Sequence, residues 1–258
     1  MQTQRIKDFF NFQNKIVLIT GCSGQLGINF SKLFLDLGAI VFGFDKKTNL
    51  IRHKNFSYLK TDISKKNKVQ KNIDTIIQKY KRIDVIINNA GYSVFTKYIN
   101  RTDAELNKTV DANLKGPIHI INSYVKTHKK KKLKKCKIIN IGSIYGSMSP
   151  DFRVYGKKDN FNSEIYGATK AALIQITKYY SVILSSLSIN VNCLSPGGIY
   201  NEKKPQNKSF VKKYSSRIPK KRMAKSEDFN TGILFLASDK SDYVTGQNLI
   251  IDGGLSAW

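Results

Sequence analysis

Residues 15–27 read Lys-Ile-Val-Leu-Ile-Thr-Gly-Cys-Ser-Gly-Gln-Leu-Gly. The first part, Ile16–Thr20, is short, apolar and rich in β-branched residues, as is typical of a strand buried in a parallel sheet. Gly21, Gly24 and Gly27 follow at three-residue intervals, and helical periodicity begins behind them. A strand, a glycine-rich turn and a helix in this order predict a site where a helix N-terminus binds the diphosphate of a dinucleotide.

An acidic residue at the end of the next strand-like segment extends this prediction. The run Ile40–Phe44 leads to Asp45, where a carboxylate can accept hydrogen bonds from the adenosine ribose and repel a 2′-phosphate. We therefore expect NAD to be preferred over NADP as cofactor. Lys46 and Lys47 oppose this preference because a cation beside the acid could offset the repulsion, although lysine side chains can turn to solvent.

Strand-like and helical segments alternate along the whole chain. Such alternation indicates right-handed βαβ units and a parallel sheet with helices on both faces. We expect an α/β fold, a doubly wound Rossmann-type parallel sheet with seven strands in three layers, as a single domain over residues 1–258. The expected strands are Ile16–Thr20, Ile40–Phe44, Phe56–Lys60, Ile83–Asn88, Lys137–Ile141, Asn190–Leu194 and Asn248–Ile251. The expected helices are Gln25–Leu37, Lys65–Tyr80, Ala104–His128, Ser163–Leu187 and Ser226–Ala237, and the polar segment Asn201–Lys225 is expected to be a lid or binding loop.

A tyrosine and a lysine four residues apart point to proton-transfer chemistry. Tyr166 and Lys170 open the apolar-periodic run Ala171–Leu187, so both side chains should lie on one face of a helix. There the ammonium can stabilise the phenolate and lower the pKa of the phenol from about 10 towards neutrality. Such a phenol can exchange a proton with a ketone or an alcohol. Tyr200 and Lys204 share the spacing but follow a Ser-Pro-Gly-Gly loop, which argues against a helix.

Together these features resemble the short-chain dehydrogenase/reductase family, in its compact single-domain branch. The resemblance runs from about Asn14 to Gly254. Gln25 stands where that branch usually has glycine, and the interval from Ser143 to Tyr166 is longer than in most of its members. The resemblance rests on eight ordered motifs: Thr20-Gly-Cys-Ser-Gly-Gln-Leu-Gly27, Asp62, Asn88-Asn-Ala-Gly91, Asn113, Ile141-Gly-Ser143, Tyr166 with Lys170, Ser195-Pro-Gly-Gly198 and Asp252-Gly-Gly254.

The resemblance implies a role for each catalytic candidate. Tyr166 would be the proton donor in reduction, and Lys170 would also hold the nicotinamide ribose. Ser143, at the end of a strand, would orient and polarise the substrate carbonyl. Asn113 would support a water-linked proton relay to the lysine. The glycine turn and the resemblance together imply a cofactor site formed by Gly21, Ser23, Gly24, Gln25, Leu26, Gly27, Asp45, Asp62, Ile63, Asn89, Ala90, Gly91, Tyr166, Lys170, Pro196, Gly197 and Ile199.

We therefore expect an NAD(P)-dependent oxidoreductase that interconverts a ketone and a secondary alcohol. The segment Ser143-Ile-Tyr-Gly146, with the insertion around Pro150, is similar to a subgroup that acts on bacterial surface-sugar precursors, so a sugar or sugar-derived precursor of surface polysaccharide is the expected substrate. Two alternatives remain open. One is an activity like that of 3-oxoacyl carrier-protein reductases, which would use NADPH, and the other is a catalytically silent NAD-binding regulator.

The composition bears on partners and compartment. The net charge is +26, and the densest basic run is Lys126–Lys137, where a helix should end on the side away from the cofactor. Because basic residues also occur throughout the chain, we interpret them as a solvated surface rather than a nucleic-acid site. Three cysteines and three histidines lack metal-ligand spacing, so no metal is expected. The odd cysteine count and the lack of a signal-like or membrane-spanning window favour a cytoplasmic protein with no membrane partner.

The resemblance also implies a homodimer or homotetramer, formed through the two long helices. Tyr124, Tyr179 and Val182 lie off the main apolar stripes of those helices and are expected to pack across a two-fold axis. The C-terminal Trp258 is expected to close the cleft of a neighbouring subunit.

Overall fold

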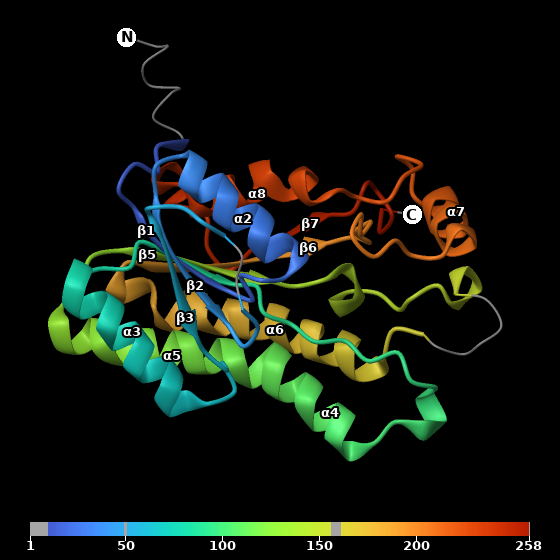
Figure 1. Ribbon diagram of the computed structural model, residues 1–258, viewed down its shortest axis with the longest axis horizontal. Helices are drawn as coiled ribbons and strands as arrows, with labels where there is room; N and C mark the ends of the chain where they lie inside the picture. The colour runs from blue at the N-terminus through green and yellow to red at the C-terminus, as the bar shows by residue number, and fades with distance from the viewer. Residues whose placement is uncertain (1–9, 49–50, 156–160, 258) are drawn as a thin grey trace, which may run out of the picture.

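A computed structural model describes residues 10–48, 51–155 and 161–257 (Figure 1). These residues form one seven-stranded sheet in which every pair of neighbouring strands is parallel. The strand order is β3-β2-β1-β4-β5-β6-β7, so the chain winds outward from β1 to one edge, returns beside β1, and then winds to the other edge. The strands are β1 (Ile16–Thr20), β2 (Ile40–Asp45), β3 (Phe56–Lys60), β4 (Val85–Asn88), β5 (Cys136–Ile141), β6 (Ile189–Pro196) and β7 (Asn248–Ile251).

Helices cover both faces of the sheet, which confirms the expected doubly wound fold in three layers. In Figure 1, α2 (Gln25–Asp36) and α8 (Asn230–Ala237) lie on one side, and α3 (Lys66–Tyr80), α5 (Gly116–Lys131) and α6 (Glu164–Ile183) lie on the other. Two further helices, α4 (Asp103–Val110) and α7 (Lys208–Arg217), lie near the end of the sheet where the strands finish. The winding direction reverses between β1 and β4, and ligands of such sheets bind beyond that reversal.

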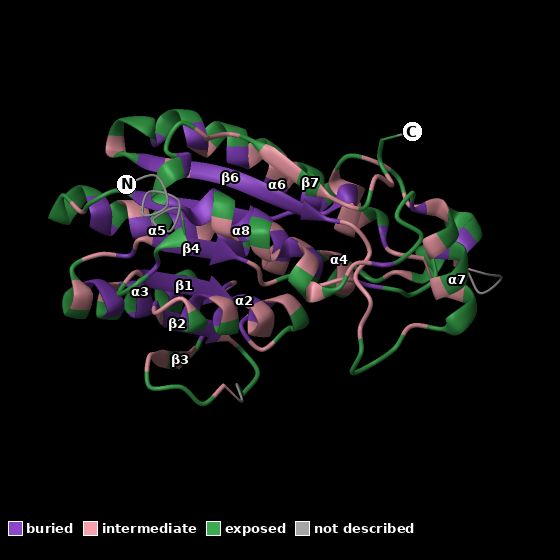
Figure 2. Cartoon of the chain, turned by 90° about the horizontal axis from the view of Figure 1, so that it is seen from above, coloured by how far each residue is buried: buried purple, intermediate pink, exposed green. Residues whose placement is uncertain are grey.

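The alternation of side chains along β1 builds the two halves of the core. Ile16 and Leu18 pack with residues of α3 and α5, whereas Val17 and Ile19 pack with residues of α2 and α8. All five residues of β1 and all six of β5 are buried, as expected for central strands covered on both faces (Figure 2). The apolar runs recognised in the sequence therefore form the middle of the sheet.

Three expected helices are interrupted in the structure. In the one expected over Ser163–Leu187, α6 ends at Ile183 and a short 3₁₀-helix, Ser185–Leu187, follows. The single helix expected over Ala104–His128 is divided, because a turn of π-helix at Asp111–Lys115 separates α4 from α5. The segment expected over Ser226–Ala237 begins with a short 3₁₀-helix, Ser226–Phe229, before α8. Inside the expected lid segment the structure contains α7, whose N-cap Asn207 accepts a hydrogen bond from the backbone of Ser209.

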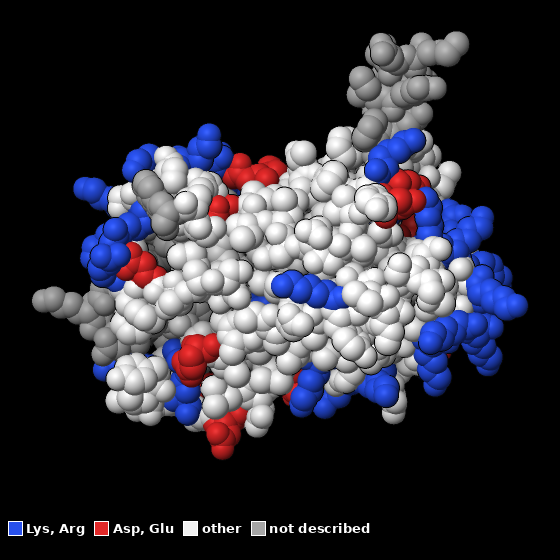
Figure 3. Space-filling view, turned by 180° about the vertical axis from the view of Figure 1, so that it is seen from behind, with Lys and Arg blue, Asp and Glu red and all other residues white. Residues whose placement is uncertain are grey.

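The basic run after α5 is only partly the solvated surface that we expected. The helix ends at Lys131, and the lysines of its last turn favour its negative dipole end. Lys137 is instead buried in β5, where its ammonium forms an ion pair with Asp242 and donates to Asn190 Oδ1 at 3.2 Å. The prediction was wrong at this position because the strand carries the side chain inward, beside a carboxylate distant in sequence. Elsewhere, Lys and Arg side chains gather at the two ends of the molecule (Figure 3).

No helix in the described part of the chain is both long enough and apolar enough to span a membrane.

Candidate active site

The glycine turn brings the ends of β1 and β4 into direct contact. Gly21 has a φ of +66°, and a Cβ atom there would lie 2.7 Å from the Cα atom of Ala90. A Cβ atom at Gly27 would lie 2.0 Å from the carbonyl oxygen of Gly21, at the start of α2. Only glycine therefore allows the turn to fold this tightly under the helix N-terminus. Gly24, the N-cap of α2, makes no side-chain cap, so the first N–H groups of the helix face the space in front of the turn.

Thr20 and Asn89 hold this arrangement with four hydrogen bonds. The side-chain amide of Asn89 donates to the carbonyl oxygens of Thr20 and Gly21, at 2.9 and 3.1 Å. In return, Thr20 Oγ1 accepts from the backbone N–H groups of Asn89 and Ala90, both at 3.0 Å. The loop after β4 is thus locked to the glycine turn at the point where the winding of the sheet reverses.

Asp45 lies at the end of β2 with its carboxylate fixed by the backbone. Its two oxygens accept hydrogen bonds from the N–H groups of Ser23, at 3.0 Å, and Lys47, at 2.9 Å. The ammonium of Lys46 lies 3.6 Å from Asp62 rather than beside Asp45. Burial would raise the pKa of Asp62, but hydrogen bonds from Ser64 and the charge of Lys46 hold that pKa below its usual value.

Three catalytic candidates converge where β5 ends and α6 begins. Ser143 follows β5, and its Oγ accepts from the backbone of Tyr145 at 3.2 Å. Tyr166 lies in the first turn of α6, whose N-cap Ser163 accepts its backbone N–H at 3.2 Å. Lys170 follows one turn later, with its ammonium 5.6 Å from the centre of the Tyr166 ring and donating to the carbonyl oxygen of Ile141 at 2.6 Å. The expected placement of both side chains on one helix face is therefore seen.

The titration of these groups differs from the sequence-based expectation. Burial raises the pKa of Tyr166 above its ordinary value, although a hydrogen bond with Ser143 acts in the opposite direction. Burial also lowers the pKa of Lys170 to about 8. The expected lowering of the tyrosine pKa by the lysine is not seen, and the lysine ammonium donates to the carbonyl oxygen of Ile141. Its proton is correspondingly easier to remove than that of an ordinary lysine.

Asn113 lies in the π-helical turn and connects the loop after β4 with α6. Its Oδ1 accepts from the backbone of Tyr92 at 2.7 Å, and its Nδ2 donates to the carbonyl of Tyr92 at 2.9 Å and to Thr169 Oγ1 at 3.1 Å. A Cβ atom placed on Gly91 would lie 3.5 Å from Asn113 Oδ1 and 3.8 Å from Lys170 Nζ. Asn113 thus reaches the neighbourhood of the lysine from beneath the loop.

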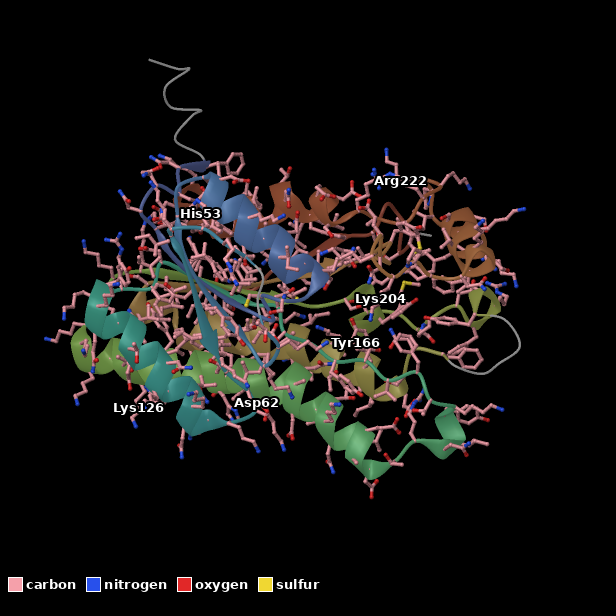
Figure 4. The ribbon with its side chains drawn as sticks, in the orientation of Figure 1. His53, Asp62, Lys126, Tyr166, Lys204 and Arg222 are labelled. Carbon is pink, nitrogen blue, oxygen red and sulfur yellow. The ribbon has the colours of Figure 1, made fainter. Side chains whose placement is uncertain are left out.

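One cavity of about 1410 Å³ joins the glycine turn to the catalytic candidates. Every sequence-predicted site residue lines it except Gly27 and Asn113, which support its wall from behind. In Figure 4, Asp62 lies near the end of β3, whereas Tyr166 lies nearer to α7. Tyr200 and Lys204 lie outside the described helices and do not line this cavity. This agrees with the interpretation that their four-residue spacing does not place them on one face of a helix.

The sequence interpretation missed most of the far end of this cavity. That end is lined by aromatic side chains and by amides and hydroxyls from the segment after β4, the insertion before α6, and the lid. The polar, weakly periodic character of the insertion and lid was the only signal available for them. The additional residues are Ser93, Phe95, Asn107, Lys108, Tyr145, Tyr155, Asn162, Gln206, Asn207, Phe210, Tyr214 and Met223.

Comparisons with known proteins agree with this geometry. The family model described as enoyl-(acyl carrier protein) reductase matches residues 41–256. A 3-oxoacyl-(acyl-carrier-protein) reductase of Thermotoga maritima is 32% identical over 255 residues, which cover 94% of this chain and 98% of the relative. A solved short-chain dehydrogenase of Leptospira borgpetersenii with bound NAD+ superposes with a TM-score of 0.89 at 37% identity, covering 95% of this chain and 94% of that one.

The chain belongs to the short-chain dehydrogenase/reductase family.

The resemblance recognised from the motifs is thereby confirmed, as is the class of NAD(P)-dependent oxidoreductase. A further relative in this family, an NAD-dependent glycerol dehydrogenase of Listeria innocua, is 29% identical over 253 residues, 95% of each chain. Within this short-chain dehydrogenase/reductase, the side chain of Gln25 makes a hydrogen bond that a glycine could not make. Its side-chain amide donates to the carbonyl oxygen of Tyr200 at 2.7 Å, which connects the glycine turn to the residue that immediately precedes the lid.

Proposed function

We propose that this enzyme interconverts a ketone and a secondary alcohol with NAD(H), acting on a sugar or a sugar-derived precursor of surface polysaccharide. The observation that carries the proposal is the convergence of Ser143, Tyr166 and Lys170 on the cavity that also contains the glycine turn. The tight turn at Gly21 and the open N-terminus of α2 fit the diphosphate of a dinucleotide. All seven strands share one sheet, which supports treating residues 1–258 as a single domain.

The proposed catalytic roles follow from the positions of the side chains. A nicotinamide cofactor supplies or accepts the two electrons when it is bound. In reduction, Tyr166 donates its proton to the substrate oxygen, and in oxidation its phenolate accepts that proton. Ser143, which is hydrogen-bonded to Tyr166, orients the same oxygen. Lys170, with a pKa of about 8, is suited to return a proton to the phenol near neutral pH, and Asn113 holds the loop and helix between which that proton passes.

Asp45 supports the preference for NAD. Its carboxylate is fixed by two backbone N–H groups and lines the cavity, so it is present to meet the adenosine ribose and to repel a 2′-phosphate. Lys46, one of the two cations that could offset this repulsion, pairs with Asp62. The solved relative that contains NAD+ is 37% identical to this chain, which supports the same assignment. A relative with bound NADPH, 26% identical, shows that the fold also accommodates the phosphorylated cofactor.

The polar lining at the far end supports a polyhydroxylated substrate. Amide and hydroxyl side chains line that end together with aromatic rings, a combination suited to hydrogen-bonding several hydroxyl groups and covering an apolar ring face. The similarity to a glycerol dehydrogenase favours the same class. The second candidate is 3-oxoacyl carrier-protein reduction, favoured by the family model and by the 32% identical relative. A panel of sugars, polyols and acyl thioesters, followed by the absorbance of the reduced nicotinamide, tests the two candidates. Turnover of acyl thioesters alone would reject the sugar assignment.

We also propose that the enzyme is a cytoplasmic homodimer or homotetramer. On α6, Tyr179, Val182 and Ile183 have 59%, 79% and 53% of their surface exposed, and apolar residues exposed together favour contact with a partner. Tyr124, which we expected on the same surface, is fully buried in the core between α5 and the sheet, so it takes no part in this contact. The position of Tyr124 off the main apolar stripe wrongly indicated an outer surface. Because α5 packs against both α3 and the sheet, a wider face of this helix is buried than the stripe alone suggests. Trp258 lies outside the described residues.

A further inference from the structure

The insertion before α6 delivers one tyrosine into the catalytic cavity. Tyr155 follows the short 3₁₀-helix Phe152–Val154 and lines the cavity. Its ring packs against Phe161 and Phe210, with centroid distances of 5.6 and 5.3 Å. Phe210 belongs to α7, so the ring of Tyr155 is held between the insertion and the lid. The orientation of its hydroxyl group is therefore set by packing rather than left free.

The hydroxyl of Tyr155 belongs to a chain of three phenols. It lies 3.3 Å from the hydroxyl of Tyr145, which also forms a side-chain hydrogen bond with Tyr214. Tyr214 Oη in turn accepts the backbone N–H of Gly198 at 3.0 Å, in the loop after β6. Three hydroxyl groups contain three protons, and two bonds between them use two of these. One O–H therefore remains to donate to a ligand, whichever way the protons are arranged.

Tyr155 is connected to the reacting centre through Tyr145. The backbone N–H of Tyr145 donates to Ser143 Oγ at 3.2 Å, and Tyr155 lines the same cavity as Ser143 and Tyr166. The oxygen of Tyr155 accepts a backbone hydrogen bond from Asn162. When Tyr214 donates to Tyr145 and Tyr145 donates to Tyr155, the O–H of Tyr155 is the one left to donate to a ligand. Tyr166 and Ser143 hold the reacting oxygen of the substrate, and the next oxygen along a polyol chain is displaced by only one carbon. A donor in the same cavity as Tyr166 can meet that second oxygen.

We propose that Tyr155 is a specificity-determining residue whose hydroxyl binds the oxygen on the carbon next to the reacting one. The enzyme then selects vicinal diols and 2-hydroxy ketones over isolated alcohols and ketones. This inference rests on the proposed function, and it narrows the substrate class. A 3-oxoacyl thioester has its second oxygen two carbons from the ketone, so the same contact does not favour it. The insertion between Ser143 and Tyr166, whose purpose the motifs left unexplained, thereby acquires a role in recognition.

The test compares two alcohols that differ by the neighbouring hydroxyl. We measure kcat/KM for the oxidation of butane-2,3-diol and butan-2-ol at saturating NAD+, with the wild type and with Tyr155→Phe, which keeps the ring and its packing. Tyr243→Phe is the matched control, since Tyr243 is fully exposed. We expect the wild type to have a higher kcat/KM for the diol than for butan-2-ol. Tyr155→Phe should lower the kcat/KM for the diol about 10-fold and leave the kcat/KM for butan-2-ol within about twofold of the wild-type value. The control variant should retain both values.

Other results separate this inference from the proposed function. Equal losses for both alcohols in Tyr155→Phe, or no preference for the diol in the wild type, would overturn the specificity role. If the wild type oxidises neither alcohol, the proposed function fails for small secondary alcohols. Binding of each alcohol to the NAD+-saturated enzyme, measured by saturation-transfer NMR, then still decides the inference. A diol signal that weakens in Tyr155→Phe supports it, and identical signals in the two proteins refute it.

Discussion

Replacing Tyr166 with phenylalanine tests the central assignment. The change removes one oxygen atom and keeps the ring that packs in the wall of the cavity. The hydroxyl lost is the one bonded to Ser143, whereas the bond from Lys170 to the carbonyl of Ile141 does not involve it. General acid–base catalysis is typically worth about 10²–10⁴ in rate, so we expect kcat to fall by that factor, which corresponds to about 3–5 kcal/mol of barrier.

Cofactor binding should be nearly unaffected in the same variant. The glycine turn, Asp45 and the N-terminus of α2 make no hydrogen bond to the Tyr166 hydroxyl within the described residues, so the Kd for NADH should stay within about twofold. Single-turnover reduction by the variant, together with NADH fluorescence titration, measures both quantities. Tyr200→Phe is the matched control, because that tyrosine also precedes a lysine by four residues but is not one of the residues that line the cavity. Near-normal turnover in Tyr166→Phe would refute the assignment and direct attention to Tyr155.

Three further predictions concern the cofactor, the buried lysine and assembly. The enzyme should show a higher kcat/KM with NADH than with NADPH, and Asp45→Ser should reduce that ratio; a clear NADPH advantage in the wild type would mean that the lysines beside Asp45 dominate. Burial lowers the pKa of Lys170 from 10.5 to about 8, so the unfolded chain binds more protons between these values and the free energy of unfolding should rise with pH across that window. Urea titrations should show this rise in the wild type and a smaller one in Lys170→Met; parallel curves would contradict the buried, easily deprotonated lysine. Light scattering at low micromolar concentration should give a mass above 29.3 kDa, and Val182→Glu should lower it, whereas a wild-type monomer would exclude the assembly.

The sheet and the tight glycine turn after β1 could be predicted because both are determined by residues close together in the sequence. The β-branched run Ile16–Thr20 is typical of a central strand, and the contact between Gly21 and Ala90 demands a residue without a side chain. Such constraints act over a few residues and leave a visible pattern. Tyr166 and Lys170 could be recognised for the same reason, because residues four apart in the sequence lie one turn apart on a helix.

The missed features depend on contacts between distant segments. Tyr155 reaches the cavity because its ring meets Phe210 of α7, and nothing local in either segment indicates that contact. Lys137 is buried because Asp242, far along the chain, supplies a counter-charge. The division between α4 and α5 is also non-local in origin, since Asn113 in the π-helical turn is held by Tyr92 and Thr169. Periodicity in the sequence continues through that turn and does not reveal it.

The hydrogen bond from Gln25 to the carbonyl oxygen of Tyr200 connects the two ends of the cavity. Gln25 belongs to the glycine turn at which we propose that the dinucleotide binds, and Tyr200 immediately precedes the lid, whose residues line the far end of the cavity. An outward movement of the lid at Tyr200 would break this bond, so the release of a substrate beneath the lid and of a cofactor at the glycine turn would be coupled. One hydrogen bond contributes about 1 kcal/mol, which is enough to change the dissociation rate of a ligand several-fold. The residue that stands where the compact branch usually has glycine would thus link the dissociation rates of cofactor and substrate.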